Sequence, residues 1–335
     1  MKVDTSLSND GDLTASARAA QGAGYDGLWV GETNRDPFLL SLLAVQGTTD
    51  VTVGTSIAIA FARTPMTLAL SAYDLARYSS GRFVLGLGSQ VKAHIERRYS
   101  MPWSHPAPRM RELILAMRAI WATWQDGVPL NFEGEFYRHT LMTPFFTPEP
   151  VRTGPPPVFL AGVGAHMTAV AGEVADGFFC HAFTTERYIR EVTVPALQKG
   201  RSAGGHAELS GFTMCLPAFV TVGRNDEEMA TAVTGTKKQI AFYASTPAYR
   251  GVLDLHGWGE VQPELTRLSK AGGWDQMGDL ITDEMLDAFS VVGTPSEVAK
   301  GLRSRYDGLI DRLSFYMPYD GARDALPEVL SALKA

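Results

Sequence analysis

Cysteine is scarce in this chain, and the signals of secreted and membrane proteins are missing from it. Only Cys180 and Cys215 occur in 335 residues, which excludes a disulfide-stapled secreted domain and a zinc site built from several thiolates. No apolar run approaches the roughly 18 residues that predict a membrane-spanning helix, and the first residues lack the basic-then-apolar order of a signal peptide. We therefore expect a cytoplasmic enzyme that does not bind a membrane.

Familiar catalytic motifs and an excess of positive charge are also missing. The chain has no H-E-x-x-H or C-x-x-C sequence, so common metalloprotease and dithiol chemistries have no support. Thirty basic and 36 acidic side chains give a net charge of −6, which argues against nucleic acid or an anionic membrane as the main partner. The expected partner is a small-molecule substrate, and no metal site is predicted.

The pattern that is present is a regular alternation of short β-branched runs with amphipathic stretches. Eight such runs are predicted as strands, at residues 3–7, 26–30, 51–59, 82–87, 158–161, 178–180, 212–222 and 312–316. Parallel neighbouring strands need long crossover connections, which helices provide. Eight strand–helix units favour a closed (β/α)8 barrel over the alternative, an open doubly wound sheet.

Two segments interrupt the alternation and are interpreted as insertions in one domain that covers residues 1–335. The first lies near 94–157 and contains a long helical stretch at 109–124 and a hairpin at 132–139. The second lies near 245–290 and carries no strand signal. The pattern Thr294-Pro295-Ser296-Glu297 predicts a capping box at the start of the last long helix.

The candidate site residues lie in the loops just after the strands, because a barrel builds its active site from those loops. Two glycine-bearing loops, at 86–90 and 161–166, follow strands and open helices. Glycine there lets backbone amides approach an anion at a helix N-terminus, although both loops could equally be tight turns. Neither loop has the G-x-G-x-x-G or Walker spacing, so the sequence gives little support for a dinucleotide-binding or an ATP-binding site.

Charged and histidine side chains near the strand ends are further candidates. The segment 92–98 holds Lys92, Arg97, Arg98 and His94, and could receive an anionic group or simply form a solvated helix face. His94 and His181 follow two different strands and would need tertiary structure to bring them together. Cys180 and Cys215 lie within apolar runs, where core packing is their expected role.

Several motifs resemble the luciferase-like monooxygenase superfamily, in the expected order along nearly the whole chain. They are Gly24-Tyr25-Asp26-Gly27-Leu28-Trp29 with Glu32, Val53-Gly54-Thr55-Ser56-Ile57 with Arg63-Thr64-Pro65, Gly81-Arg82-Phe83, Ala175-Asp176-Gly177-Phe178, and Val292-Gly293-Thr294-Pro295. Within the superfamily, residues 88–98 and 101–106 resemble the branch that uses the deazaflavin coenzyme F420. The resemblance implies a barrel, a cofactor at the carboxyl ends of the strands, and a homodimer.

The resemblance also implies individual cofactor-binding residues. A non-prolyl cis peptide in the third strand, here Ser56–Ile57, would press the back of the flavin-like ring. The cofactor phosphate would sit on the backbone of Gly162, Val163, Gly164 and Ala165. Ser89, Gln90 and His94 would flank the cofactor, and Lys92 would favour its anionic tail. Relatives place an aspartate, often followed by histidine, after the second strand, where this chain has Glu32-Thr33.

The leading hypothesis is hydride transfer between coenzyme F420 and an unidentified small organic substrate. A monooxygenase that uses reduced flavin mononucleotide (FMN) is the alternative within the same fold, and a barrel that binds cofactor without chemistry is the alternative from another class. Hydride transfer to a carbonyl needs a proton donor. His94 is the first candidate, because the ordinary pKa of histidine is about 6.5; Glu32 is the second and His181 the third.

Overall fold

Eight parallel strands close into a barrel, as the sequence predicts. The computed structural model describes residues 1–8, 11–319 and 323–335. The barrel strands are β1 (Lys2–Ser6), β2 (Gly27–Val30), β3 (Thr52–Thr55), β5 (Phe83–Gly88), β8 (Val158–Ala161), β9 (Gly177–Phe179), β10 (Thr213–Val222) and β12 (Arg312–Tyr316). They pair in this order, and β10 closes the ring because it pairs with both β9 and β12.

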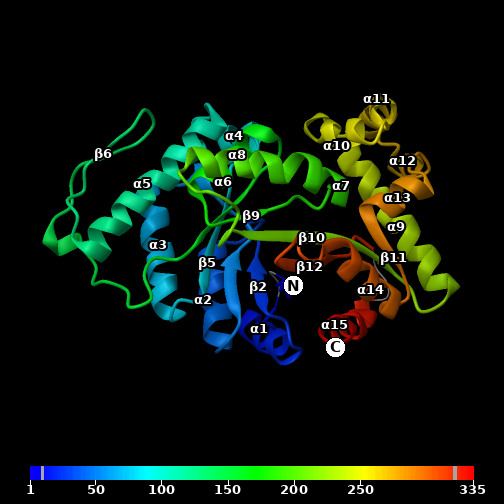
Figure 1. Ribbon diagram of the computed structural model, residues 1–335, viewed down its shortest axis with the longest axis horizontal. Helices are drawn as coiled ribbons and strands as arrows, with labels where there is room; N and C mark the ends of the chain where they lie inside the picture. Colours follow the sequence, from blue (N-terminus) through cyan, green and yellow to red (C-terminus); the bar gives the residue numbers. More distant parts are fainter. Residues whose placement is uncertain (9–10, 320–322) are drawn as a thin grey trace.

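Helices surround the barrel and follow the strands (Figure 1). They are α1 (Leu13–Gly22), α2 (Pro37–Gly47), α3 (Pro65–Tyr78), α5 (Pro106–Asp126), α6 (Ala165–Val174), α8 (Val194–Ala203), α9 (Asp226–Ala244), α14 (Pro295–Tyr306) and α15 (Leu326–Lys334). Local chemistry explains several starts. Asp36 accepts hydrogen bonds from the first turn of α2, and the predicted capping box of α14 is present, since the Thr294 amide donates to Glu297 at 2.9 Å.

The strand predictions differ from the structure at two places. The run 51–59 is divided into β3 and the two-residue β4 (Ala58–Ile59), with a cis peptide bond between Ser56 and Ile57. An unpredicted strand, β11 (Ser290–Gly293), pairs in parallel with the outer part of β10. Its run of apolar residues is short, and it is a strand because the ten-residue β10 offers it an unpaired edge.

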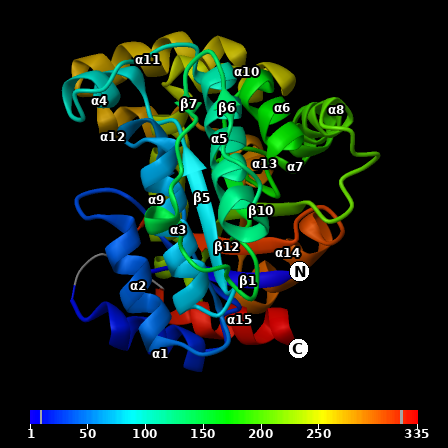
Figure 2. The same ribbon diagram turned by 90° about the vertical axis from the view of Figure 1, so that its left-hand side faces the viewer.

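The first insertion contains most of α4 (Lys92–Arg97), the whole of α5, and a hairpin of β6 (Phe132–Glu133) and β7 (Arg138–His139) that projects from the body in Figure 1. The second contains α10 (Arg250–Leu255), α11 (Gln262–Ala271), α12 (Trp274–Gly278) and α13 (Asp283–Phe289). In both views these four helices lie at the end of the barrel opposite the chain termini (Figures 1 and 2). Since β1 begins at residue 2, the second insertion covers the carboxyl ends of the strands.

The helical segment between β9 and β10, over residues 186–203, is interrupted. The structure has a short α7 (Glu186–Tyr188), a π-helical turn over Ile189–Thr193, and then α8. Pro195 lacks an amide hydrogen and its ring would clash with the carbonyl of Glu191 in a regular α-helix. A wider π turn before this proline avoids that clash.

The barrel interior combines an aromatic cluster with one ion pair. Trp29, Phe159 and Phe179 contact one another, with ring centroids 5.0–6.4 Å apart. Beside them Arg312 donates to both carboxylate oxygens of Asp4 at 2.7 and 2.8 Å, and the Trp29 indole donates to Asp4 at 2.9 Å. Gly27 leaves the necessary room, because a Cβ there would lie 2.3 Å from the Arg312 guanidinium.

Among the described residues, no helix combines the length and apolar character needed to cross a bilayer.

Candidate functional site

Several of the predicted site residues meet at the carboxyl ends of adjacent strands. In the β5–β8 pairing Leu87 lies opposite Leu160, and in the β8–β9 pairing Ala161 lies opposite Phe179. The loops that follow these strands, including Ser89, Gly162 and His181, are therefore neighbours at one mouth. The side chain of Ile57 lies at the same mouth, because a Cβ on Gly88 would be 2.8 Å from it.

The loop of Gly162, Val163, Gly164 and Ala165 opens helix α6. Gly164 is the N-cap residue, with φ 79° and ψ 157°, and no side chain caps the helix. The first amide groups of an α-helix have no acceptor within the helix, and the helix dipole makes this end positive. A Cβ on Gly164 would meet no atom within 4 Å, so there is open space beside this residue. The loop fits an anionic group such as a phosphate.

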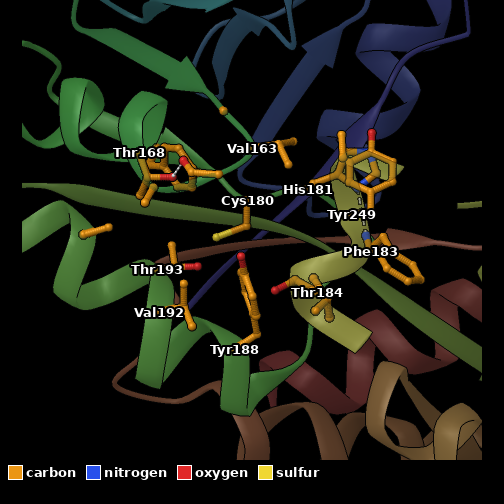
Figure 3. Close-up of a pocket in the computed structure, with 17 residues that line it drawn as sticks. Val163, Thr168, Cys180, His181, Phe183, Thr184, Tyr188, Val192, Thr193 and Tyr249 are labelled. Atoms are coloured by element: carbon orange, nitrogen blue, oxygen red, sulfur yellow. Dashed lines mark hydrogen bonds between the residues drawn. The ribbon is translucent and has the colours of Figure 1, made fainter. Parts of the chain in front are cut away.

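This loop forms one wall of a pocket that is partly open to solvent (Figure 3). The other walls come from the end of β9, from the α7–π-turn segment, and from the second insertion. Its lining residues outside the loop are Thr168, Phe178, Cys180, His181, Phe183, Thr184, Tyr188, Val192, Thr193, Ala196, Ala248, Tyr249 and Val252. This lining contains no Asp, Glu, Lys or Arg side chain.

The hydrogen bonds of His181, which lines this pocket, define which of its ring nitrogens carries the hydrogen. Its Nδ1 accepts a hydrogen bond from the Phe183 amide at 3.0 Å, so Nδ1 carries no hydrogen. The hydrogen of the neutral ring therefore lies on Nε2, which is 3.1 Å from the Tyr249 hydroxyl. Burial lowers the pKa of His181 to about 4, because the apolar surroundings disfavour the charged imidazolium. His181 is thus a neutral hydrogen-bond donor toward Tyr249.

The depressed pKa of His181 predicts a specific loss of stability in acid. A histidine in the unfolded chain takes up a proton below pH of about 6.5, whereas His181 in the folded chain does so only near pH 4. Stability present above pH 6.5 is therefore lost as the pH falls toward 4. We expect the parent to lose about 2 kcal/mol more than His181→Gln between pH 7 and pH 4.5. Urea unfolding at both pH values measures this; equal losses in the two proteins would contradict it.

Aromatic side chains hold His181 and Tyr249 in place. The Tyr249 ring stacks on His181 with centroids 4.6 Å apart, and the edge of Tyr243 approaches the His181 ring at 4.9 Å. Tyr243, on α9, also forms a 2.8 Å hydrogen bond to Tyr316 at the end of β12. Tyr249 lies at the start of the second insertion. Sequence reasoning missed it, because that segment has no periodic pattern and only the fold brings it to the barrel mouth.

Glu32 lies at the mouth in a dense network outside the pocket. Both of its oxygens accept hydrogen bonds from Arg63, at 2.7 and 3.0 Å. The Ile59 amide and the Tyr99 hydroxyl donate to it as well, at 2.7 and 3.1 Å. Its side chain is only 5% exposed. This geometry is that of a paired carboxylate that fixes the turn after the cis peptide bond.

The remaining predicted residues lie on the β5 side of the mouth, and none of them lines the pocket. Ser89 and Gln90 are half-buried in the loop after β5, where Gln90 has φ 59°. Lys92 and His94 are exposed on α4, and the Lys92 ammonium lies 3.8 Å from the Glu96 carboxylate. The structure therefore brings the Gly162–Ala165 loop and His181 together, and leaves Glu32 and His94 apart from them.

Comparison with known proteins places this architecture in a family. The model of the luciferase-like monooxygenase family matches residues 4–312. The chain is 52% identical over 314 residues to the uncharacterized protein Rv1360 of Mycobacterium tuberculosis, which covers 93% of this chain and 92% of that protein. It is 26% identical to the 5,10-methylenetetrahydromethanopterin reductase of Archaeoglobus fulgidus, over 86% of this chain and 83% of that protein.

A solved structure shows the same fold. The coenzyme F420-dependent tetrahydromethanopterin reductase of Methanopyrus kandleri superposes with a TM-score of 0.78 at 19% identity. The superposition covers 99% of this chain and 97% of the other. Because the family model spans nearly the whole barrel, the chain belongs to the luciferase-like monooxygenase family.

Proposed function

We propose that the protein is an oxidoreductase that transfers a hydride between coenzyme F420 and a small organic substrate. The observation that carries the proposal is the uncapped N-terminus of α6, whose Gly162–Ala165 loop faces a pocket at the barrel mouth. Two similar proteins support the choice of cofactor class, since one is named a methylenetetrahydromethanopterin reductase and the other an F420-dependent enzyme. The resemblance of residues 88–98 to the F420-dependent branch of the family also supports F420 as the cofactor.

Each group of residues has a distinct task in this proposal. The amides that follow Gly164 would hold the cofactor phosphate. Ser56 and Ile57 would support the ring, and Ser89 and Gln90 would flank it. When bound, the deazaflavin supplies or accepts a hydride at a ring carbon. Lys92 and Arg97 on α4 and Arg98 directly after it are exposed. Their positive charges would attract the anionic tail of the cofactor.

The proton donor is the part of the mechanism that the sequence leaves open. Glu32 has both oxygens engaged by Arg63, and His181 is a neutral ring whose Nδ1 accepts a backbone hydrogen bond. His94 is exposed on α4 outside the pocket. None of these three predicted acids directs a free proton into the pocket, which leaves the other residues of the pocket lining as candidate donors.

The test of the cofactor is a direct titration of the purified protein with F420 and with FMN. We expect F420 to bind more tightly, and its affinity to fall as salt rises, because exposed charges are screened at high ionic strength. Tighter binding of FMN would favour the monooxygenase alternative and contradict the proposal. F420 binding without turnover of any carbonyl or alcohol would favour the non-catalytic alternative.

A further inference from the structure

We propose that Tyr249 donates a hydrogen bond and a proton to the substrate oxygen, that His181 positions it, and that the substrate is an uncharged carbonyl compound or the corresponding alcohol. This inference rests on the proposed function, because it names the acid and the substrate class of the same site. Its evidence is the hydrogen-bond direction at His181, the anchoring of Tyr249, and the absence of charge in the pocket wall.

The direction of the His181–Tyr249 hydrogen bond determines where the tyrosine proton points. The Phe183 amide occupies Nδ1 of His181, so Nε2 must be the protonated nitrogen and must donate to the Tyr249 oxygen, 3.1 Å away. A hydroxyl that accepts this bond keeps its own hydrogen for another acceptor. Tyr249 lines the pocket. The hydroxyl hydrogen is therefore not used by His181, whose ring lies beside Tyr249 in Figure 3, and we infer that a substrate oxygen accepts it.

The segment that carries Tyr249 is anchored from two sides. On one side its ring stacks on His181. On the other, the buried Gln262 donates to the carbonyls of Ala244 and Thr246 at 3.3 and 3.1 Å, and Thr266 donates to the carbonyl of Ser245 at 2.8 Å. A proton donor has to be held within hydrogen-bond reach of the reacting atom. These contacts hold Tyr249 at the mouth without a charged partner.

The wall of the pocket indicates the charge of the substrate. Its side chains are apolar or neutral, with Phe183, Val192 and Val252 beside hydroxyl groups such as Thr184 and Thr193. Moving a carboxylate or phosphate into such a wall without a cationic partner is strongly unfavourable. The positive end of α6 is the feature that would attract an anion, and the cofactor phosphate is proposed to occupy it. An uncharged carbonyl oxygen, in contrast, matches the donor hydrogen of Tyr249.

Tyr249 and His181, together with a reduced deazaflavin, account for every proton and electron pair of the reaction. In the reductive direction, the reduced deazaflavin, when bound, would supply the hydride for a new C–H bond at the carbonyl carbon, and the C=O π pair would move to oxygen. That oxygen takes the hydroxyl proton of Tyr249, which gives the alcohol. The phenolate left behind accepts the Nε2–H bond of His181, and the half-buried Tyr249 regains a proton from solvent. Burial and the neighbouring Tyr243 raise the pKa of Tyr249, so it begins the reaction protonated.

The first experiment compares ligand binding by the parent and by Tyr249→Phe, which keeps the stacked ring. The probes are cyclohexanone, the charged 4-oxocyclohexanecarboxylate and the oxygen-free methylcyclohexane, with affinities measured by ligand-observed NMR. We expect the parent to prefer cyclohexanone to the carboxylate. Tyr249→Phe should bind cyclohexanone about three- to tenfold more weakly, the effect of losing one hydrogen bond, and bind methylcyclohexane unchanged. Equal affinities of both proteins for cyclohexanone, or no binding by the parent, would overturn the role of Tyr249; preference for the carboxylate would overturn the substrate class.

The second experiment measures turnover with reduced F420 and cyclohexanone or benzaldehyde. We expect Tyr249→Phe to lower kcat by about 10²- to 10⁴-fold with unchanged F420 affinity, whereas Tyr78→Phe, at an exposed site on α3, leaves kcat unchanged. His181→Phe should lower kcat, and His181→Gln, whose amide can still donate to Tyr249, should restore part of it. A loss in His94→Ala with none in Tyr249→Phe would assign the acid to His94 and overturn the inference. A parent that binds no F420 contradicts the proposed function instead, and the binding experiment then decides the role of Tyr249.

Discussion

Replacing Arg312 by leucine is expected to lower the free energy of unfolding by about 3–5 kcal/mol, because it leaves Asp4 charged and unpaired inside the barrel. The Asp4 side chain is 1% exposed and that of Arg312 is 8% exposed. The Arg312 guanidinium also lies over the Trp29 ring, 5.5 Å from its centroid. Urea unfolding followed by circular dichroism measures the change, and thermal melting gives an independent estimate.

Two further variants separate this effect from the general loss of an ion pair. Arg250→Leu removes the partner of Asp254 in a pair whose side chains are 44% and 51% exposed, and is expected to cost at most about 1 kcal/mol. The double variant Asp4→Leu/Arg312→Leu removes both charges, so it should lose less stability than Arg312→Leu alone. A loss below about 1 kcal/mol for Arg312→Leu would show that Asp4 becomes hydrated or protonated at little cost.

Replacing Gly164 by valine is expected to weaken F420 binding at least about tenfold, which is roughly 1.4 kcal/mol. Its φ of 79° with ψ of 157° belongs to a backbone region that only glycine adopts readily. A valine must therefore shift the loop, which moves the first amides of α6. Its side chain would also occupy open space beside the loop that lines the pocket, where the phosphate is proposed to bind. Fluorescence titration with F420 measures the dissociation constant.

Gly154→Val is the matched control for this prediction. Gly154 also has a positive φ, 77°, and a Cβ there would likewise meet no atom within 4 Å. It lies in the loop before β8 and does not line the pocket. The strain of a side chain at positive φ is thus present in both variants, and only Gly164→Val should lose affinity. An unchanged dissociation constant for Gly164→Val would place the phosphate elsewhere.

The sequence by itself determined the barrel and part of its mouth. The alternation of strand and helix signals is local, because several helices carry their own capping residues and each strand shows its own apolar run. For this reason the eight strands and the capping box at Thr294 and Glu297 could be predicted. The Gly162–Ala165 loop and His181 could be proposed for a related reason. They directly follow strands, and parallel strands end at one edge of the barrel.

Only the tertiary structure decided which of these side chains are free to act. Glu32 and Arg63 are 31 residues apart in the chain, and their pairing becomes visible when β2 and the turn after β4 are side by side. Tyr249 meets His181 across 68 residues, and β11 is a strand because β10 extends past its barrel neighbours. These contacts join segments whose local sequences carry no sign of one another. The barrel could thus be predicted from local patterns, whereas the pairings that select its chemical groups are long-range and arise only on folding.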